Sequence, residues 1–468
     1  MPRRFASARS RGDRVYVSMP SIARNNFLRT LGREGRLTAA LALPLAAGQI
    51  SQIFISLADT LMVGRLGVLP LAAATFANNV LYIPFIFGLG LSMAISVRVS
   101  QARGAGDREA ARAALRHGVF LSLLVGTLTV LGGWALQPFL TLFGQDPEVV
   151  RAMPRYFLLV AASMIPALAS MAVKNHADAM NKPWTPFWIM LGAAGLNVVF
   201  NWIFIYGKLG APRMGLEGAG LATLLVRLAM LTAMIWWCVR AEAVRDWVPT
   251  RWFRAPEWPA VLDLVRIGLP ASLQLLAEVS AFVMVTLLIG TLGPAALASH
   301  QVAMTCAATI FMVPLGLSMA LTVRMGEAWG AKEWTRLRFI LVSGWGLALA
   351  FTACSAQGFL FFNHTIAGWF LTEPTARGLT ANLLLVSAAF QVSDALQVSS
   401  GCALRGLGDV KIPALLAFFA YWVIAIPAGW WLTFRAGLGV AGMWWGITLG
   451  LTTTAIALGL RVWRKTAA

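Results

Sequence analysis

Residues 43–74 read LPLAAGQISQIFISLADTLMVGRLGVLPLAAA, and residues 269–300 repeat this stretch as LPASLQLLAEVSAFVMVTLLIGTLGPAALASH. A second pair has the same offset of 226 positions: GLGLSMAISVRVSQARGA at 88–105 and PLGLSMALTVRMGEAWGA at 314–331. About a third of the aligned positions are identical, which is more than a hydrophobic composition alone would give. The chain therefore contains an internal duplication.

The composition predicts a membrane protein. Of the 468 residues, 58% are hydrophobic and 12% are charged, whereas a soluble chain has about 25% charged residues. Apolar stretches of about 20 residues, enough to cross a hydrocarbon core of roughly 30 Å, recur along the chain. We expect an all-α polytopic membrane protein with spans at 38–64, 71–99, 113–139, 153–178, 184–207, 214–239, 262–290, 296–324, 337–362, 379–405, 411–433 and 440–462.

The duplication and the spans together predict the domain organisation. Each repeat holds six spans, and an even number of crossings gives both copies the same orientation, as in parallel repeats about an axis along the membrane normal. Two six-helix lobes facing one another would enclose a central cleft, where transporters of this kind bind their cargo. The expected parts are a basic cytoplasmic tail at 1–37, an N-lobe at 38–239, a cytoplasmic linker at 240–260, a C-lobe at 261–462 and a short tail at 463–468.

The net charge of +19 is explained by membrane topology. With the N-terminus inside, the inner segments hold 29 Lys and Arg residues and the outer segments hold seven, which is the positive-inside pattern. We therefore expect both termini in the cytoplasm, a bacterial inner-membrane location, and anionic lipids as partners in place of nucleic acid. A monomer is expected. The basic N-terminal stretch is not a cleavable signal peptide, and Met19 is an alternative start.

Three acidic residues lie within predicted spans, where a charged side chain costs about 2.5–3.5 kcal/mol. Glu278 lies roughly 18 Å and Asp394 roughly 22 Å from the outer ends of their spans, at 1.5 Å per residue. Similar depths allow these two carboxylates to converge within the C-lobe. Asp59 lies only roughly 8 Å from the outer end of the first span.

Neutral oxygen-bearing side chains accompany Glu278 and Asp394 on their own helices. Crowded carboxylates in a low-dielectric site cannot all ionise easily, so one holds a proton or a cation binds between them. Carboxylates with neutral oxygens suit a proton or a hard cation such as Na+. A helix–helix hydrogen bond is the structural alternative. The neighbouring oxygen donors are Gln274, Gln397, Ser393 and Ser400.

Other polar residues within spans have weaker signals. Asn197 and Asn201 lie one turn apart on the fifth span, where they suit either interhelical hydrogen bonds or a binding site. His300 is expected to cap or pack a helix. Arg98 and Arg324, related by the repeat, are expected to be topological and lipid anchors. The four cysteines have no metal-binding or disulfide spacing.

Several motifs together resemble the multidrug and toxic compound extrusion (MATE) family, and within it the NorM-type branch. They are the Pro44 to Asp59 pair in the first span, LGPAALASHQ at 292–301, PLGLSMALTVRMGEAWG at 314–330, and DALQVSSGCALRGLGDVKIP at 394–413. The resemblance covers nearly all of the chain from residue 38 to residue 462. It implies a V-shaped fold and antiport of organic, often cationic or amphipathic, drugs against Na+ or H+, without a cofactor.

The resemblance also implies roles for individual residues. Glu278 and Asp394 match the C-lobe cation site, and Asp59 matches an acid of the N-lobe. Pro44 matches a proline at which some relatives bend, which makes it a candidate hinge. Polar partners of Asp59 would be Asn197, Asn201 and Thr223, and residues lining the cation or substrate site would be Gln274, Phe390, Gln397 and Gln52.

This sequence departs from the family pattern at two of these positions. Asn201 stands where proton-coupled members often have an aspartate, and Phe390 stands where a tyrosine is often found. Gln52 occupies the repeat position of Glu278, so the duplicated halves have diverged in their chemistry.

Alternative functions are a flippase for lipid-linked saccharides or a proton-coupled exporter of an endogenous metabolite. A flippase should line its cleft with many Lys and Arg residues, but only Arg227 and Arg266 are predicted within or at the start of spans. A membrane enzyme would need a nucleophile or metal motif such as H-E-x-x-H, and the sequence has none. A channel would not require a carrier-like duplication.

Overall fold

The computed structural model describes residues 21–252 and 254–467, with side chains from Phe27 onward, and these residues form helices and short connections. The proposed start at Met19 and most of the expected basic tail lie outside the described residues. The long helices of the first half are α1 (Ser21–Gly64), α2 (Val68–Gly104), α3 (Arg108–Leu136), α5 (Pro154–Ala179), α6 (Trp184–Tyr206) and α7 (Leu216–Arg240). Those of the second half are α9 (Trp258–Gly290), α10 (Pro294–Gly330), α11 (Trp334–Phe370), α12 (Pro374–Gly406) and α15 (Val440–Lys465), with α13 (Lys411–Phe419), the π-helix η2 (Ala420–Ala425) and α14 (Ile426–Phe434) forming one further span.

Twelve helices of the described chain are long and apolar enough to cross a membrane, as the sequence predicts. Helices are the expected form because a backbone in lipid must satisfy its own hydrogen bonds. Several helices are longer than the predicted spans, and α1 begins at Ser21. The expected boundary between a tail and a lobe at residue 38 therefore falls inside α1, because hydropathy marks the lipid crossing and not the helix ends.

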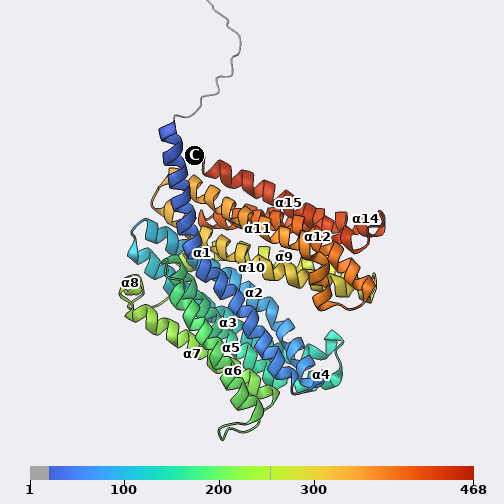
Figure 1. The fold of residues 1–468 in the computed structure, drawn as a ribbon. Coiled ribbons are helices and arrows are strands. Elements are labelled where there is room, and N and C mark those ends of the chain that lie inside the picture. The colour runs from blue at the N-terminus through green and yellow to red at the C-terminus, as the bar shows by residue number, and fades with distance from the viewer. Residues whose placement is uncertain (1–20, 253, 468) are drawn as a thin grey trace, which may run out of the picture.

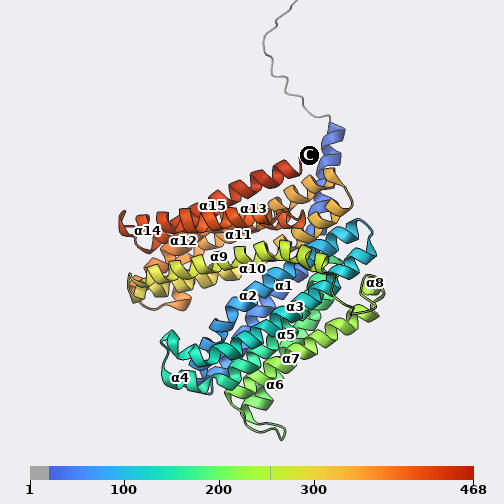
Figure 2. The same cartoon turned by 180° about the vertical axis from the view of Figure 1, so that it is seen from behind.

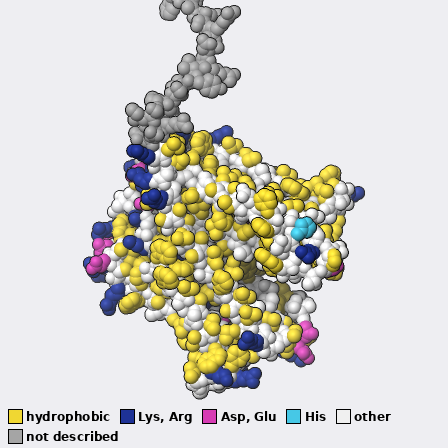
Figure 3. All heavy atoms as spheres, in the orientation of Figure 1, with side chains coloured by type: hydrophobic (Ala, Val, Ile, Leu, Met, Phe, Trp, Pro, Cys, Tyr) yellow, Lys and Arg dark blue, Asp and Glu magenta, His cyan; other side chains and the backbone are white. Residues whose placement is uncertain are grey.

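The helices form two bundles, α1–α7 and α9–α15, arranged as a V (Figures 1 and 2). The bundles meet near the end of the molecule where α1 begins and α15 ends, which we call the closed end. They diverge toward the opposite end, the open end, which carries α4 (Pro147–Ala152) in one bundle and α14 in the other. Apolar side chains cover the flank of both bundles, and the surface is hollowed between them (Figure 3).

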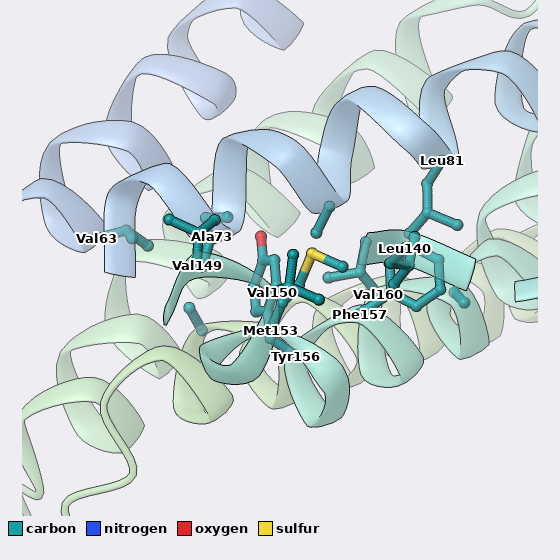
Figure 4. Packing of buried hydrophobic residues seen from close by; sticks show 14 of the residues in the cluster. Val63, Ala73, Leu81, Leu140, Val149, Val150, Met153, Tyr156, Phe157 and Val160 are labelled. Atoms are coloured by element: carbon teal, nitrogen blue, oxygen red, sulfur yellow. The ribbon is translucent and has the colours of Figure 1, made fainter. Parts of the chain in front are cut away.

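The core of the N-lobe is most extensive toward the open end. There, η1 (Gln137–Phe143) and α4 cover the space between α2 and α5 with Leu140, Val149 and Val150 (Figure 4). Phe157 is fully buried among them. These short elements close the lobe at this end.

Repeat-related contacts join the two lobes at the closed end. A Cβ atom added to Gly104 would clash with the carbonyl oxygen of Glu327, and one added to Gly330 would clash with the carbonyl oxygen of Gln101. Each residue of the first contact is related to one of the second by the 226-residue offset. Glycine permits this backbone approach because it has no side chain, so α2 and α10 cross here with pseudo-two-fold symmetry.

Two ion pairs cross between the lobes beside these glycines. The guanidinium of Arg98 donates to both carboxylate oxygens of Asp263, at 2.6 and 2.5 Å. The guanidinium of Arg324 donates to the carboxylate of Glu34 and to the hydroxyl of Thr38. The prediction that both arginines are lipid anchors is wrong, because their charges are paired within the protein.

The segment between the lobes is held against the N-lobe. It contains α8 (Glu242–Arg245), and its Val248 side chain is buried. Arg112 donates to the carbonyl oxygen of Asp246 at 2.9 Å, and Arg116 forms a 2.9 Å ion pair with Glu257. The linker is therefore fastened to α3.

Candidate functional site

The C-lobe brings Glu278 of α9 together with the predicted glutamines. Gln274 and Gln397 each donate a hydrogen bond from Nε2 to Oε1 of Glu278, both at 3.1 Å. The first bond follows from helical spacing, since residues four apart share a face. The second joins α9 to α12. Two amide groups from two helices therefore hold one carboxylate oxygen in place.

Asp394 of α12 is close enough to Glu278 for the two carboxylates to interact electrostatically. Among the described residues, no side chain forms a hydrogen bond or an ion pair with it. The predicted neighbours Ser393 and Ser400 point elsewhere: Ser393 bonds to Thr452 at 2.7 Å, and Ser400 accepts from an indole at 3.1 Å. The structure therefore supports the pairing of the acids and not the serine contributions.

Phe390 does not line the central cavity. It is buried in the C-lobe core, where its ring lies 5.5 Å from that of Trp444. The same indole donates from Nε1 to His300 Nδ1 at 3.2 Å, and His300 Nε2 lies 3.0 Å from the Thr286 hydroxyl. Phe390 therefore packs in the core and is not part of the wall of the central cavity, while its lining of the cation site stays a prediction. His300 has the packing role that was expected.

A tyrosine that the sequence did not single out lies beside the acid pair. Tyr421 is buried on η2 and interacts electrostatically with both Glu278 and Asp394. A π-helix is rare and frequently marks a functional site. The hydroxyl of Tyr421 is thus available as a neutral oxygen where Phe390 supplies none. The hydropathy pattern did not indicate a role for Tyr421, because the π-helical turn changes which side of the helix this residue lies on.

The N-lobe brings Asp59 of α1 together with both predicted asparagines of α6. Asn201 donates from Nδ2 to Asp59 Oδ1 at 2.6 Å and to Asn197 Oδ1 at 3.1 Å. Both asparagines are buried, and the Oδ1 atom of Asn201 has no hydrogen-bond partner. The site therefore has an acceptor available for a proton-bearing group or a cation.

Asp59 lines a cavity of about 330 Å³ within the N-lobe. Thr223 also lines it, although its hydroxyl donates to the carbonyl oxygen of Ala219 at 2.9 Å. Sequence reasoning did not assign Tyr156 or Arg227 to this site, yet both line it. Both residues are far from Asp59 in the sequence, so no local motif indicated that they share a site with it.

A second cavity of about 380 Å³ lies between the lobes. It is bordered by Gln52, Gln274, Glu278 and Gln397, so four of the predicted residues face the cleft. Thioether side chains adapt to irregular apolar ligands. The methionines in its wall are Met93, Met171, Met190, Met230 and Met319.

Three cationic side chains also line this central cavity: Lys174, Arg227 and Arg405. The expectation that the cleft has few basic residues is therefore wrong. Two of the three were assigned to the inner segments by sequence, because Lys174 and Arg405 lie near helix ends. Lys174 forms a buried 2.6 Å ion pair with Asp178.

Pro44 lies within α1, which continues through it. Proline removes one hydrogen bond of a helix interior. A hinge at Pro44 stays a prediction.

The MatE family profile matches the chain twice, over residues 44–203 and 270–431. The chain belongs to the MATE family. Relatives of this MATE protein include a "Probable multidrug resistance protein NorM" of Bradyrhizobium diazoefficiens, 36% identical over 428 residues, covering 91% of this chain and 92% of the relative. "Multidrug resistance protein PmpM" of Pseudomonas aeruginosa is 33% identical over 434 residues, covering 91% of this chain and 90% of the relative. The predicted resemblance to NorM-type proteins is confirmed.

Solved MATE structures share the fold. A structure described as the outward-facing conformation of a multidrug resistance MATE family transporter has a TM-score of 0.84 and 23% identity, covering 93% of this chain and 96% of the other. A variant of the Vibrio cholerae MATE transporter VcmN has a TM-score of 0.85 and 21% identity, covering 93% and 98%. The predicted two-lobed, twelve-helix fold is confirmed, and the family assignment makes the chain a transporter and not an enzyme.

Proposed function

We propose that this MATE-family protein is a multidrug efflux antiporter driven by Na+ or H+. The observation that carries the proposal is that the carboxylates of Glu278 and Asp394 interact electrostatically. No described side chain forms a hydrogen bond or an ion pair with Asp394. Glu278 borders the central cavity, so a charge change at the pair acts directly on any ligand in the cleft. The names of the relatives supply the substrate class, since both are multidrug resistance proteins.

The acids link the ion to the drug by competition. While the cleft is accessible from the open end, Glu278 and Asp394 take up a cation, and the Tyr421 hydroxyl supplies a neutral oxygen. The added positive charge weakens the hold of Glu278 on the positively charged group of a drug, which leaves. Reversal of access then releases the ion on the other side.

Energetics restrict the stoichiometry. A tenfold ion gradient supplies about 1.4 kcal/mol, and a potential of about 150 mV adds about 3.5 kcal/mol for each net charge moved. One monovalent ion exchanged for one monovalent drug moves no net charge, so only the gradient acts. Stronger accumulation needs at least two ions per drug, or a drug without net charge.

Asp59 is proposed as a second ion-coupling residue. Its hydrogen bond from Asn201, and the buried Oδ1 atom that Asn201 leaves without a partner, suit a group that alternates between ionised and neutral forms. Gln52, the repeat counterpart of Glu278, lines both the N-lobe cavity and the central cavity. Gln52 is therefore an uncharged side chain shared by the walls of the two cavities.

The placement in the cell follows from the charge pattern. We propose a bacterial inner-membrane monomer with both termini in the cytoplasm and with the basic residues near anionic lipids. The closed end is then the cytoplasmic end. The lobes are proposed at 38–239 and 261–462, joined by the linker at 240–260.

Ethidium export from proteoliposomes tests the function, with a Na+ pulse and a pH jump applied separately. The wild type should respond to one ion or both, and Glu278→Gln and Asp394→Asn should lose that response. A response to the pH jump that survives in both variants but not in Asp59→Asn would move the coupling to the N-lobe. No response to either ion would contradict antiport.

A further inference from the structure

A groove of about 310 Å³ lies between α13 and α15 in the C-lobe, and it shares no lining residue with the cavities described above. α13 begins at the closed end with Lys411, and α15 ends there with Lys465. The two helices therefore run in opposite directions along the groove (Figure 2).

The wall that α15 contributes changes from apolar to cationic along the helix. Its lining residues follow the spacing i, i+3, i+4, i+7 and i+8, which places side chains on one face. The first two are apolar, and the last three are basic. In chain order they are Ala457, Leu460, Arg461, Arg464 and Lys465.

The apolar part of the groove is open to the surroundings of the bundle. Ile412 and Leu416 of α13, one helical turn apart, complete its wall. Ile412 is 39% exposed and Leu460 is 55% exposed. Lipid tails are as apolar as a leucine side chain, so in a membrane an acyl chain can cover these residues without an energetic penalty.

The cationic end of the groove has more positive charge than the protein neutralises. Asp409 accepts from Arg461 at 2.7 Å and from Lys465 at 2.9 Å. Arg464 is exposed and forms no ion pair with any described residue. Three cations thus share one carboxylate, which leaves an excess of two positive charges.

Two features of this end suit a phosphate group. A guanidinium matches phosphate oxygens with parallel N–H donors, and Arg464 has its guanidinium available. The start of a helix also favours an anion, and α13 begins next to the groove residue Ile412 without a side-chain cap.

From this arrangement we propose that the groove binds one anionic phospholipid, with its phosphate at Arg464 and an acyl chain along Ile412, Leu416, Ala457 and Leu460. Ala457 and Arg464 are seven residues apart, or about 10 Å along the helix, so one molecule with a charged head and an apolar tail can contact both. The inference concerns a single site and not the general attraction of basic residues to the membrane. It goes beyond the proposed antiport, and only the assignment to the cytoplasmic leaflet rests on the proposed orientation.

The charge of the groove also predicts which phospholipids bind. A phosphatidylcholine carries an ammonium group in its head, which the excess positive charge opposes. A phosphatidylglycerol has no such group and keeps the full negative charge of its phosphate. A soluble phosphate compound would contact the cationic end alone and leave the apolar part uncovered.

Native mass spectrometry of the delipidated protein in detergent tests the inference without measuring transport. The protein is titrated with palmitoyl-oleoyl phosphatidylglycerol, with the phosphatidylcholine of the same chains, and with glycerol phosphate. The variants are Arg464→Gln, Arg464→Lys and Ala457→Phe, which fills part of the apolar groove. Arg240→Gln is the matched control, because Arg240 is also an exposed cation in the last turn of a span, α7 of the N-lobe.

We expect the wild type to bind one phosphatidylglycerol about fivefold more tightly than phosphatidylcholine, and to bind glycerol phosphate too weakly to detect. Arg464→Gln should weaken phosphatidylglycerol binding about fivefold, which corresponds to about 1 kcal/mol for one basic residue. Arg464→Lys should retain part of the affinity. Ala457→Phe should weaken binding about fourfold, the effect of removing one methylene group from apolar contact.

Equal losses of affinity in Arg464→Gln and Arg240→Gln would show a general attraction of lipid to basic residues and overturn the site. Equal affinities of the wild type for the two lipids would also overturn it. Unchanged binding in Ala457→Phe, or binding of glycerol phosphate as tight as that of the lipid, would remove the acyl chain from the groove. Each of these results leaves the proposed antiport untouched, and matching elution profiles ensure that every variant compared is folded.

Discussion

The hydroxyl of Tyr421 is a neutral oxygen beside Glu278 and Asp394, and an ion held by two carboxylates needs such a ligand. Tyr421→Phe removes that oxygen and keeps the buried ring, which packs 6.0 Å from the ring of Phe282. We expect the concentration of coupling ion at half-maximal transport to rise about fivefold, corresponding to about 1 kcal/mol for one lost polar contact. Initial transport rates at varied Na+ and pH measure this shift.

Tyr206→Phe is the control for this prediction. It loses one hydrogen bond, from the hydroxyl to the carbonyl oxygen of Met62 at 3.1 Å, outside the C-lobe. The ion dependence should then stay as in the wild type. An unchanged ion dependence in Tyr421→Phe would exclude the hydroxyl from the ion site.

Asp409 lies between α12 and α13, outside the spans, and it binds two cations of α15. Its Oδ2 accepts from Arg461 at 2.7 Å and from Lys465 at 2.9 Å. Burial alone would raise the pKa of Asp409, but these two partners lower it below the usual value of 3.8. The ionised form is therefore favoured in the folded state, so its stabilisation is present above pH 3.8 and is lost as the pH falls through the lowered pKa.

Asp409→Asn should therefore destabilise the protein at pH 7 by about 1 kcal/mol, a small value because Arg461 and Lys465 are themselves partly exposed. The difference from the wild type should shrink as the pH falls below about 4. Thermal unfolding in detergent, followed by tryptophan fluorescence from pH 3 to pH 7, measures both effects. Glu242→Gln, at an exposed acid of α8, should leave the unfolding curve unchanged, and a pH-independent loss in Asp409→Asn would contradict the ion-pair explanation.

The sequence predicted individual contacts where one helix determines them. The bond from Gln274 to Glu278 follows from a spacing of four, and the similar depth of Glu278 and Asp394 placed the acids together. It did not predict that Arg405 would face the cleft, because a basic residue near a helix end has the same pattern when it faces lipid headgroups. Tyr421 was missed because a π-helical turn is a deviation from the helical period itself.

At the scale of the elements, α2 and α10 depend on two glycines for their crossing. Gly104→Ala and Gly330→Ala each place a methyl group against a carbonyl oxygen of the partner helix, so the closed end must separate. We expect the thiol of Cys402, which is 3% exposed and lines the central cavity, to react several times faster with a water-soluble maleimide. The measurement uses a background in which Cys402 is the remaining cysteine.

Gly132→Ala is the matched control on α3, because an added Cβ would have no atom within 4 Å. It should leave the reaction rate of Cys402 unchanged. The two repeat-related substitutions should act alike, and a slow reaction of Cys402 in both would show that the closed end absorbs the methyl groups without opening.

The bounds were predicted where polarity and lipid crossing coincide, as in α6 and in the span formed by α13, η2 and α14. They were missed for α1, whose polar first turns continue the helix and bring Glu34 to Arg324. A hydropathy pattern cannot locate such turns, because Glu34 is a charged residue and is buried only through its ion pair with Arg324. The same reason explains why the two repeat-related arginines were assigned to lipid.

At the scale of the whole molecule, the cross-lobe ion pairs of Arg98 and Arg324 contain repeat-related arginines but differ in burial. The side chains of Arg324 and Glu34 are 5% and 0% exposed, whereas those of Arg98 and Asp263 are 36% and 41% exposed. Breaking a buried pair costs about 3–5 kcal/mol, and breaking an exposed one about 0–1 kcal/mol. Arg324→Gln should therefore favour opening of the closed end far more than Arg98→Gln does.

Spin labels at the open end measure this difference in a cysteine-free background. Leu142 of η1 and Leu438, between α14 and α15, are exposed on opposite lobes. Arg324→Gln should increase the population with a short distance between the two labels, and Arg98→Gln should change it little. Identical distance distributions in both variants would show that the pairs do not hold the lobes.

The inter-lobe segment, fastened to α3 through Arg112 and Asp246, has a consequence for the history of the molecule. In an ancestral homodimer, every substitution would appear in both subunits at once, and neither subunit could acquire a glutamate without the other. Fusion of two copies through a tether held by its own lobe removes that constraint. Each half of the fused chain can then acquire substitutions independently. Gln52 and Glu278 can therefore differ in charge although they occupy equivalent positions of the repeat.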